Sequence, residues 1–466
     1  MKKLKRFSGL VGVVMMSIMM ITACSNSKSA DVDDKANKEE VANSANEKEE
    51  PVTIKFTYWG SPVEKKAVED NLKKFEETYS HIVVDAEYIP NEDYLTKISA
   101  MVAGGDAPDV AYLFEANALA WAGDGELMNI NDFLEKDPDL KREDFLDNIW
   151  YDWAPGKSLG TNTAVEAMGL YYNRQLFVEA GVSVPATAED AWEWDEFIEV
   201  AQQMTIDANG NNALSSEFDA TNISRYGVQF GTWWAPYMAM VFSNGGDYIN
   251  EDGTEFTLDE PEAVEAIQRL ADLINVYHVA PSPAQVVSMP SPVVGLQSEQ
   301  VAMMIDGQWN LLDLGASGLD FGIGVLPKMK ESVTLILGSP TVIFKSTEHP
   351  DESWLLFKWL ANPESGLELH KGGLWMPLLK EWYEDPSLVA KWAENNPAHP
   401  KEYKSAMMDQ TLNNGRPAPI YYTNGFVEMD EIVGAALDEV WLGKRTAEEV
   451  LTEISDLVEG KLKGRY

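Results

Sequence analysis

The sequence predicts an α/β protein in which strands alternate with helices and a mostly parallel sheet is flanked by helices. Three features of residues 52–114 lead to this prediction. Short runs alternate apolar and polar residues, longer stretches repeat apolar residues three and four positions apart, and turn-forming residues separate the two kinds of segment. A hydrophobic share of 45% supplies a buried core. The length allows roughly two to three domains.

The first elements follow directly from these patterns. Strands are expected at 52–58, 81–88 and 109–114, with helices between them that begin near Val63 and at an N-capping Asn91. In sheets of this kind, ligands bind beyond the carboxyl ends of the strands. Residues 59–61 and 115–117, which follow the first and third strands, are therefore the positions to examine for a binding site.

A second region begins near Met168 and again mixes both periodicities. Helical patterns cover 194–204 and 261–277, strand patterns cover 226–230 and 301–305, and amphipathic helices fill 431–462. No internal repeat is present in the sequence.

Charge and composition exclude several functions. The net charge is −40, from 76 acidic and 36 basic residues, so general binding to nucleic acid is not expected. One cysteine excludes a disulfide scaffold and a cysteine-based metal site, and the five histidines have no metal-ligand spacing. Residues 207–212 resemble the start of a calcium loop, but Phe218 stands where its acidic twelfth ligand belongs. We therefore expect a polar turn there, no bound metal and no cofactor.

The N-terminus has the pattern of a secretory signal. Four basic residues precede an apolar run at 10–21, which is too short to span a bilayer comfortably. Ile21-Thr22-Ala23-Cys24 resembles a bacterial lipobox, which implies a signal peptide at 1–23 and lipid attachment, palmitate among the acyl chains, at Cys24. The alternative is an ordinary signal peptide followed by a free cysteine. Residues 24–50 are polar and acidic and predict a disordered tether that holds the protein at the outer face of the cytoplasmic membrane.

Several motifs, taken in order, resemble the sugar-binding proteins of bacterial ABC importers, the maltose-binding type of extracellular solute-binding protein. The matching segments are Ile54–Gly60, Gly104–Val110, Leu170–Phe177 with Ala180-Gly181, Met303–Trp309 and Ser353–Pro377. With the lipobox and tether, this resemblance implies a bacterium without an outer membrane.

The resemblance also implies the two-lobed, type II fold of periplasmic binding proteins, with about three segments crossing between the lobes. We place these crossings near 165–170, 335–338 and 361–364. The expected N-terminal lobe is then 51–166 with 337–363, and the C-terminal lobe is 167–336 with 364–466. A ligand would bind in the cleft between them.

Sugar recognition requires aromatic faces for the rings and fixed polar groups for the hydroxyls. In members of the family an aromatic residue at the position of Trp309 stacks on sugar, and a glutamate in a context like that of Glu166 binds hydroxyls. The Gly-Leu-Pro that often precedes this glutamate is missing here. Of the adjacent Trp233 and Trp234, we expect only one to face the cleft. The candidate ligand-binding residues are Trp59, Glu115, Asn117, Trp121, Glu166, Trp233, Trp234, Asp306, Trp309, Ser339 and Trp375.

These observations predict a monomeric binding protein without catalytic activity that captures a carbohydrate, an oligosaccharide in view of the 15 tryptophans, and delivers it to the permease of an ABC importer. An extracellular glycoside hydrolase is the alternative from another class, because aromatic residues and paired carboxylates also describe such sites. No catalytic pair stands out in the sequence. A sensory sugar-binding component is a further alternative.

Overall fold

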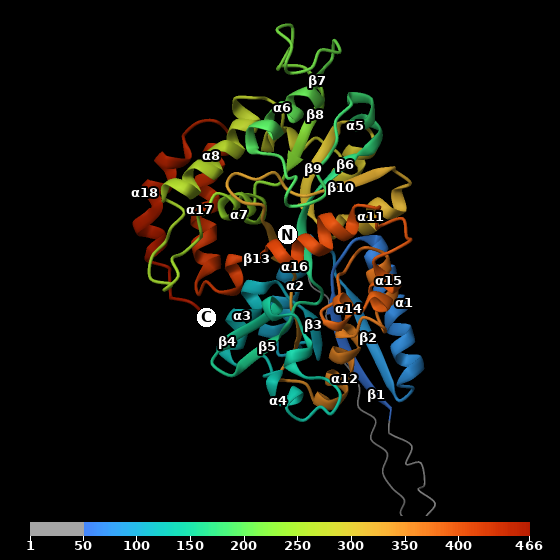
Figure 1. Cartoon of the computed structure of the whole chain (residues 1–466). Coiled ribbons are helices and arrows are strands. Elements are labelled where there is room, and N and C mark those ends of the chain that lie inside the picture. The colour runs from blue at the N-terminus through green and yellow to red at the C-terminus, as the bar shows by residue number, and fades with distance from the viewer. Residues whose placement is uncertain (1–50) are drawn as a thin grey trace, which may run out of the picture. The chain divides into compact units, whose positions relative to one another are not determined.

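Two β-sheets and one two-stranded ribbon organise the part of the chain that the computed structural model describes, residues 51–466 (Figure 1). The expected signal peptide and the whole expected tether, Cys24 included, lie outside the described residues. Residues 51–466 belong to one compact unit.

The first sheet has the strand order β12-β3-β1-β2. Strands β1 (Val52–Tyr58), β2 (Ile82–Tyr88) and β3 (Val110–Tyr112) are parallel, as expected, and β12 (Thr341–Ile343) joins β3 antiparallel. Because β1 and β3 are parallel neighbours, their carboxyl ends meet at one edge. We call this sheet with its helices the first lobe.

The second sheet has seven strands in the order β13-β11-β6-β9-β8-β7, with β10 also paired to β6. It is the upper sheet in Figure 1, and we call it with its helices the second lobe. Its strands are β6 (Glu166–Asn173), β7 (Ile206–Asp207), β8 (Ile223–Phe230), β9 (Val301–Gly307), β10 (Phe321–Gly324), β11 (Thr334–Leu337) and β13 (Gly415–Pro417). This sheet is mixed, because β6 pairs antiparallel with β9, β10 and β11. The expectation of a mostly parallel sheet therefore holds only for the first lobe, on whose strands it was based.

Helices follow the strands in both lobes. Those that precede the second sheet are α1 (Pro62–Thr78), α2 (Asn91–Ala103), α3 (Glu115–Asp124) and α4 (Asn131–Leu134), and the ribbon is β4 (Trp150–Ala154) with β5 (Lys157–Thr161). The next are α5 (Arg174–Ala180), α6 (Trp194–Met204), α7 (Trp234–Ser243), α8 (Pro261–Asn275), α9 (Pro283–Val286), α10 (Pro292–Gln297) and α11 (Asn310–Ser317). The last are α12 (Pro350–Ala361), α13 (Leu367–Lys371), α14 (Glu381–Glu384), α15 (Pro386–Trp392), α16 (Gln410–Asn414), α17 (Phe426–Trp441) and α18 (Ala447–Glu459). Short 3₁₀ turns lie at Arg142–Asp144, Asp147–Ile149 and Pro419–Tyr421, and a π-helical turn at Lys404–Asp409.

Burial explains why helix α6 was visible in the sequence and helix α7 was not. Helix α6 has the expected bounds and buries one stripe of large side chains, which gives a clear helical period. Helix α7 is buried at every position from Ala235 to Ser243, so its sequence is apolar throughout and has no period. Asn91 is not the N-cap of α2. Pro90 occupies that position, and Asn91 is the first helical residue.

Two segments run side by side where the chain passes between the sheets. Residues 162–165 connect the ribbon to β6, and residues 338–340 connect β11 to β12. The Thr163 amide donates to the Ser339 carbonyl at 2.7 Å, and the hydroxyls of Thr163 and Thr341 are 2.8 Å apart. Gly338 has a φ of +142°, and a Cβ there would lie 2.4 Å from the Ala164 carbonyl oxygen, so only glycine fits this close approach. The lobe borders themselves stay a prediction.

Candidate functional site

The main candidate site is a cavity of about 630 Å³. Trp59, Gly60 and Ser61 follow β1 along one edge, and Phe114 and Glu115 follow β3 beside them. The parallel pairing of β1 and β3 brings these two chain segments together. The cavity therefore lies beyond the carboxyl ends of the first-lobe strands, the edge at which the sequence led us to look for a binding site.

The second lobe supplies the opposite wall. Trp309 and Asp313 come from the turn after β9 and from α11, Trp233 and Trp234 from the turn after β8, and Glu166 from the start of β6. Helix α11 contacts α1 of the first lobe. Residues of both lobes thus face one cavity, as a ligand held between two lobes requires.

The aromatic side chains present differently oriented faces. Trp59 stacks on Phe114 with ring centroids 4.6 Å apart and 20° between the planes. The Trp309 and Trp233 rings are 6.2 Å apart and tilted by 42°. The six-membered ring of Trp309 packs closely against Gly307, since a Cβ on Gly307 would be 2.1 Å from two of its atoms. The part of the Trp309 side chain that this contact leaves free lines the cavity.

Trp233 and Trp234 both line the cavity, contrary to the expectation that only one would. Their ring centroids are 5.2 Å apart and their planes nearly perpendicular, at 81°. Trp233 is the N-cap of α7, with an extended backbone, and Trp234 is the first helical residue. This change of backbone conformation between the two residues permits both rings to reach one cavity. Trp233 is 42% exposed.

Four carboxyl groups line the cavity: those of Glu64, Glu115, Glu166 and Asp313. Burial raises the pKa of Glu64 and that of Glu115 to about 7. It raises the pKa of Glu166 to about 8, with further contributions from the negative charges of Glu64 and Glu115. Burial also raises the pKa of Asp313, against a hydrogen bond from Ser61. Glu64, Glu115 and Glu166 are therefore poised to exchange protons near neutral pH and to form hydrogen bonds as donors or acceptors.

Of the other expected residues, Ser339 and Trp375 also line the cavity. Trp375 is 3% exposed, and its carbonyl is 3.1 Å from Nδ1 of His370. Asn117, Trp121 and Asp306 are not among the lining residues. Asn117 lies two positions after Glu115 on α3, which turns it to a different side of the helix. Trp121 packs near Phe344 at 6.0 Å, and the Asp306 carboxylate accepts a hydrogen bond from the Gly307 amide at 2.7 Å.

Some lining residues were not predicted, notably Glu64, Tyr112, Thr163 and Asp313. Glu64 belongs to a capping box: its amide donates to Ser61 Oγ, and its carboxylate accepts from the Ser61 amide, both at 3.2 Å. The Ser-x-x-Glu spacing was a usable signal for the box, although not for the cavity. Asp313 lies four residues after Trp309, on the same side of α11.

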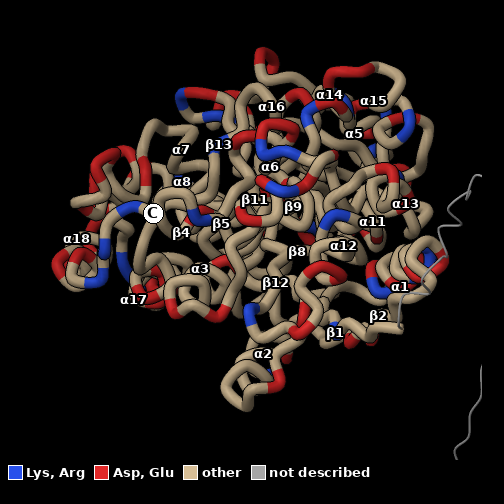
Figure 2. Tube along the Cα trace, turned by 90° about the horizontal axis from the view of Figure 1, so that it is seen from below, with Lys and Arg blue, Asp and Glu red and all other residues tan. Residues whose placement is uncertain are grey.

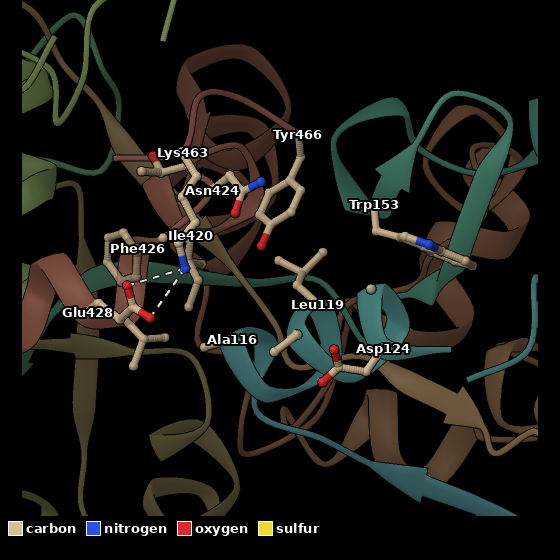
Figure 3. A pocket seen from close by; sticks show the side chains of 15 residues that line it. Ala116, Leu119, Asp124, Trp153, Ile420, Asn424, Phe426, Glu428, Lys463 and Tyr466 are labelled. Atoms are coloured by element: carbon tan, nitrogen blue, oxygen red, sulfur yellow. Dashed lines mark hydrogen bonds and ion pairs between the residues drawn. The ribbon is translucent and has the colours of Figure 1, made fainter. Parts of the chain in front are cut away.

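A second cavity of about 380 Å³ contains none of the expected residues. Figure 3 shows Leu119 and Asp124 of α3 on one side, Phe426 and Glu428 of α17 on the other, and Tyr466 above them. Its basic residue, Lys463, already pairs with Glu428 at 3.2 Å. This cavity provides control positions for experiments on the main site.

The loop that resembled a calcium site is held together by the protein's own donors. The Asp207 carboxylate accepts from the amides of Asn209, Asn211 and Asp219 and from the Asn211 side chain. Within residues 51–466, no group of three or more His, Cys, Asp or Glu side chains is arranged to hold a metal ion. No helix of residues 51–466 combines the length and hydropathy needed to cross a membrane.

Comparison with known proteins identifies the family. The model of the bacterial extracellular solute-binding protein family matches residues 50–366, so the chain belongs to this family. Its similarity to solved structures confirms the two-lobed type II α/β fold. An ABC substrate-binding protein of Listeria monocytogenes, solved with cycloalternan, matches with a TM-score of 0.76 and 23% identity over 88% of this chain and 99% of that one. A maltose/maltodextrin-binding domain of Bdellovibrio bacteriovorus, bound to maltotriose, matches with a TM-score of 0.69 and 19% identity over 88% of this chain and 99% of that one.

Sequence relatives agree with this assignment. A binding protein of Brucella abortus is 23% identical over 412 residues, which are 85% of this chain and 89% of that protein. An arabinooligosaccharide-binding protein of Halalkalibacterium halodurans is 29% identical over 182 residues, 39% of this chain and 36% of that protein. The family and these relatives are binding proteins, not enzymes, which confirms the prediction of a binding protein over a glycoside hydrolase.

Proposed function

We propose that this protein captures an oligosaccharide in the cavity between its lobes and delivers it to the permease of an ABC importer. The observation that carries the proposal is the combination of indole faces and carboxyl groups from both lobes around one cavity. Indole faces suit the C–H surfaces of sugar rings, and carboxyls form hydrogen bonds with hydroxyls. The names of several relatives also refer to oligosaccharides.

A ligand in this cavity contacts both lobes at once. It therefore binds the closed arrangement more tightly than an open one and shifts the population toward the closed form. That difference between the two forms is what a permease recognises in this proposal. No chemical step is required of any residue in the cavity.

The direct test is ligand binding by the purified protein. Intrinsic tryptophan fluorescence and the melting temperature are measured with neutral oligosaccharides, monosaccharides, amino sugars and uronates, and each sugar is checked for cleavage. A saturable change with a raised melting temperature and an intact sugar supports the proposal, since a ligand at one hundred times its Kd stabilises by about 2.7 kcal/mol. Binding of none of these sugars, or release of cleaved products, would refute it.

Anchoring at the outer face of the cytoplasmic membrane through acylated Cys24 is part of the same proposal. Its support is the lipobox-like sequence and the acidic segment that follows it. In cells fed labelled palmitate, the wild-type protein should carry the label and sediment with membranes. The Cys24→Ser protein should lose both properties, and label on that variant would contradict the assignment.

A further inference from the structure

The charge of the main cavity is entirely of one sign. Its charged lining residues are Glu64, Glu115, Glu166 and Asp313, and within residues 51–466 no lysine, arginine or histidine lines it. The four carboxyls come from four different elements, α1, α3, β6 and α11. Acidic side chains therefore face the cavity from several directions, and no basic side chain in the described part of the chain opposes them. Acidic residues also dominate the trace in Figure 2.

These carboxyls are costly for the protein to keep charged without a cation. Burial raises the pKa of each of them, and the charges of Glu64 and Glu115 raise the pKa of Glu166 further. A neutral sugar would leave these pKa values raised. A positively charged group in the cavity would lower them and would favour the ionised form of each carboxyl.

The aromatic walls add a second attraction for a cation. Five tryptophans line the cavity, among them Trp59, Trp233 and Trp309. An ammonium group above an indole face is attracted by the electrons of the ring, most strongly where water is excluded. The indoles thus fit both the apolar face of a sugar ring and a charged amine attached to it.

Tyr112 provides an independent sign of a polar ligand. Its side chain is 3% exposed and lines the cavity, and its hydroxyl has no hydrogen-bond partner among residues 51–466. Leaving a buried hydroxyl without a partner is unfavourable. A ligand hydroxyl or amine that reaches this oxygen, which is shielded from solvent in the ligand-free protein, would supply that partner.

We infer that the ligand is a carbohydrate carrying protonated amino groups, an oligomer of an amino sugar, which the indoles hold by its rings and the four carboxyls by its charge. This inference rests on the proposed function and narrows it to one class of sugar. We expect uronates and other acidic sugars to bind more weakly than amino sugars, because their negative charge opposes ionisation of the cavity carboxyls.

Three series of β-1,4-linked sugars test the inference, because they differ only at C2: glucosamine oligomers, their N-acetylated forms and cello-oligosaccharides. The full chain is titrated with dimers and trimers of each at pH 7 in low salt. We expect the amine series to bind at least tenfold more tightly than either neutral series, with a preference that falls as salt is added. Equal or tighter binding of a neutral series, or no saturable binding of the amine series, would overturn the inference.

Calorimetry in buffers of different ionisation enthalpy adds a readout of charge. An ammonium ligand lowers the pKa values of the carboxyls, so its binding should release protons, and a neutral sugar should not cause this release. Glu166→Gln should reduce the amine preference at least tenfold, whereas Asp124→Asn in the second cavity should keep it. An unchanged preference in Glu166→Gln, with circular dichroism like that of the wild type, would also overturn the inference.

If neutral oligosaccharides bind without any preference for amines, this inference fails and the proposed function stands. If no carbohydrate of any class binds, the proposed function fails as well. The two failures are therefore distinguishable in the same titrations.

Discussion

Replacing Trp309 by alanine removes an indole that lines the cavity and is only partly buried. Its six-membered ring packs against Gly307, and the nearest aromatic ring in the cavity, that of Trp233, is tilted by 42° at 6.2 Å. The exposed part of the Trp309 indole is the part that a sugar ring can cover. We therefore expect the substitution to weaken ligand binding while the fold is retained.

The magnitude follows from the area that a ligand can cover. A tryptophan side chain buries about 200 Å² when fully covered, and Trp309 is already partly buried, so at most about a third of this area, about 70 Å², remains for a ligand. At about 25 cal/mol per Å², this area is worth about 1.8 kcal/mol. The Kd should therefore rise up to about 20-fold.

The assay is a fluorescence or calorimetric titration of the full chain with its tightest-binding sugar. Trp153→Ala is the matched control, since it removes an indole from the second cavity. We expect the control to bind within threefold of the wild type. If Trp309→Ala also binds within threefold, while both variants fold, Trp309 is not a ligand contact and our account of the cavity is wrong.

Three further predictions concern the cavity and the fold. Gly307→Ala places a Cβ 2.1 Å from the Trp309 ring, so the ring must move and the Kd for the sugar should rise about tenfold. An unchanged Kd would contradict this packing. Because burial raises the pKa of Glu166 to about 8, the folded protein binds more protons than the unfolded chain between about pH 5 and 8. The free energy of unfolding of the ligand-free protein, measured in urea titrations, should thus fall as pH rises through this range. Glu166→Gln should make this dependence on pH weaker. If Glu166→Gln leaves the dependence unchanged, Glu166 is not its cause. The Asp137 side chain is buried, at 6% exposed, and accepts hydrogen bonds from Lys358 at 2.7 Å and from the Trp354 indole at 2.8 Å. Asp137→Ala should therefore lower the free energy of unfolding by about 3 kcal/mol. A loss below about 1 kcal/mol would show that these two bonds add little to stability.

Elements with a clear local pattern could be read from the sequence. Strand β1 and helix α6 have the expected bounds, because an alternating or helical stripe of buried residues is a local property. The mixed second sheet could not be foreseen in this way. Its order depends on β9, β10 and β11 returning to β6 from positions more than a hundred residues away in the chain.

The candidate site, too, was predictable from the sequence only in part. Its position beyond the ends of β1 and β3 followed from the strand–helix alternation, since parallel neighbours end at one edge. The end of the first strand pointed to Trp59, and the resemblance to solute-binding proteins singled out Trp309; both line the cavity, as does Trp375. The family model, which matches residues 50–366, confirms that resemblance.

By itself, the sequence determined the α/β class, the family, and the kinds of side chain that a sugar site needs. Only the tertiary structure decided which of those side chains meet. It brought Glu64 of α1 and Asp313 of α11 to one cavity and placed Trp121 and Asp306 outside its lining. The reason is physical. The repeat of a helix or strand shows only in the spacing of residues a few positions apart, whereas the residues that line this cavity lie up to about three hundred positions apart in the chain and meet only when the lobes pack.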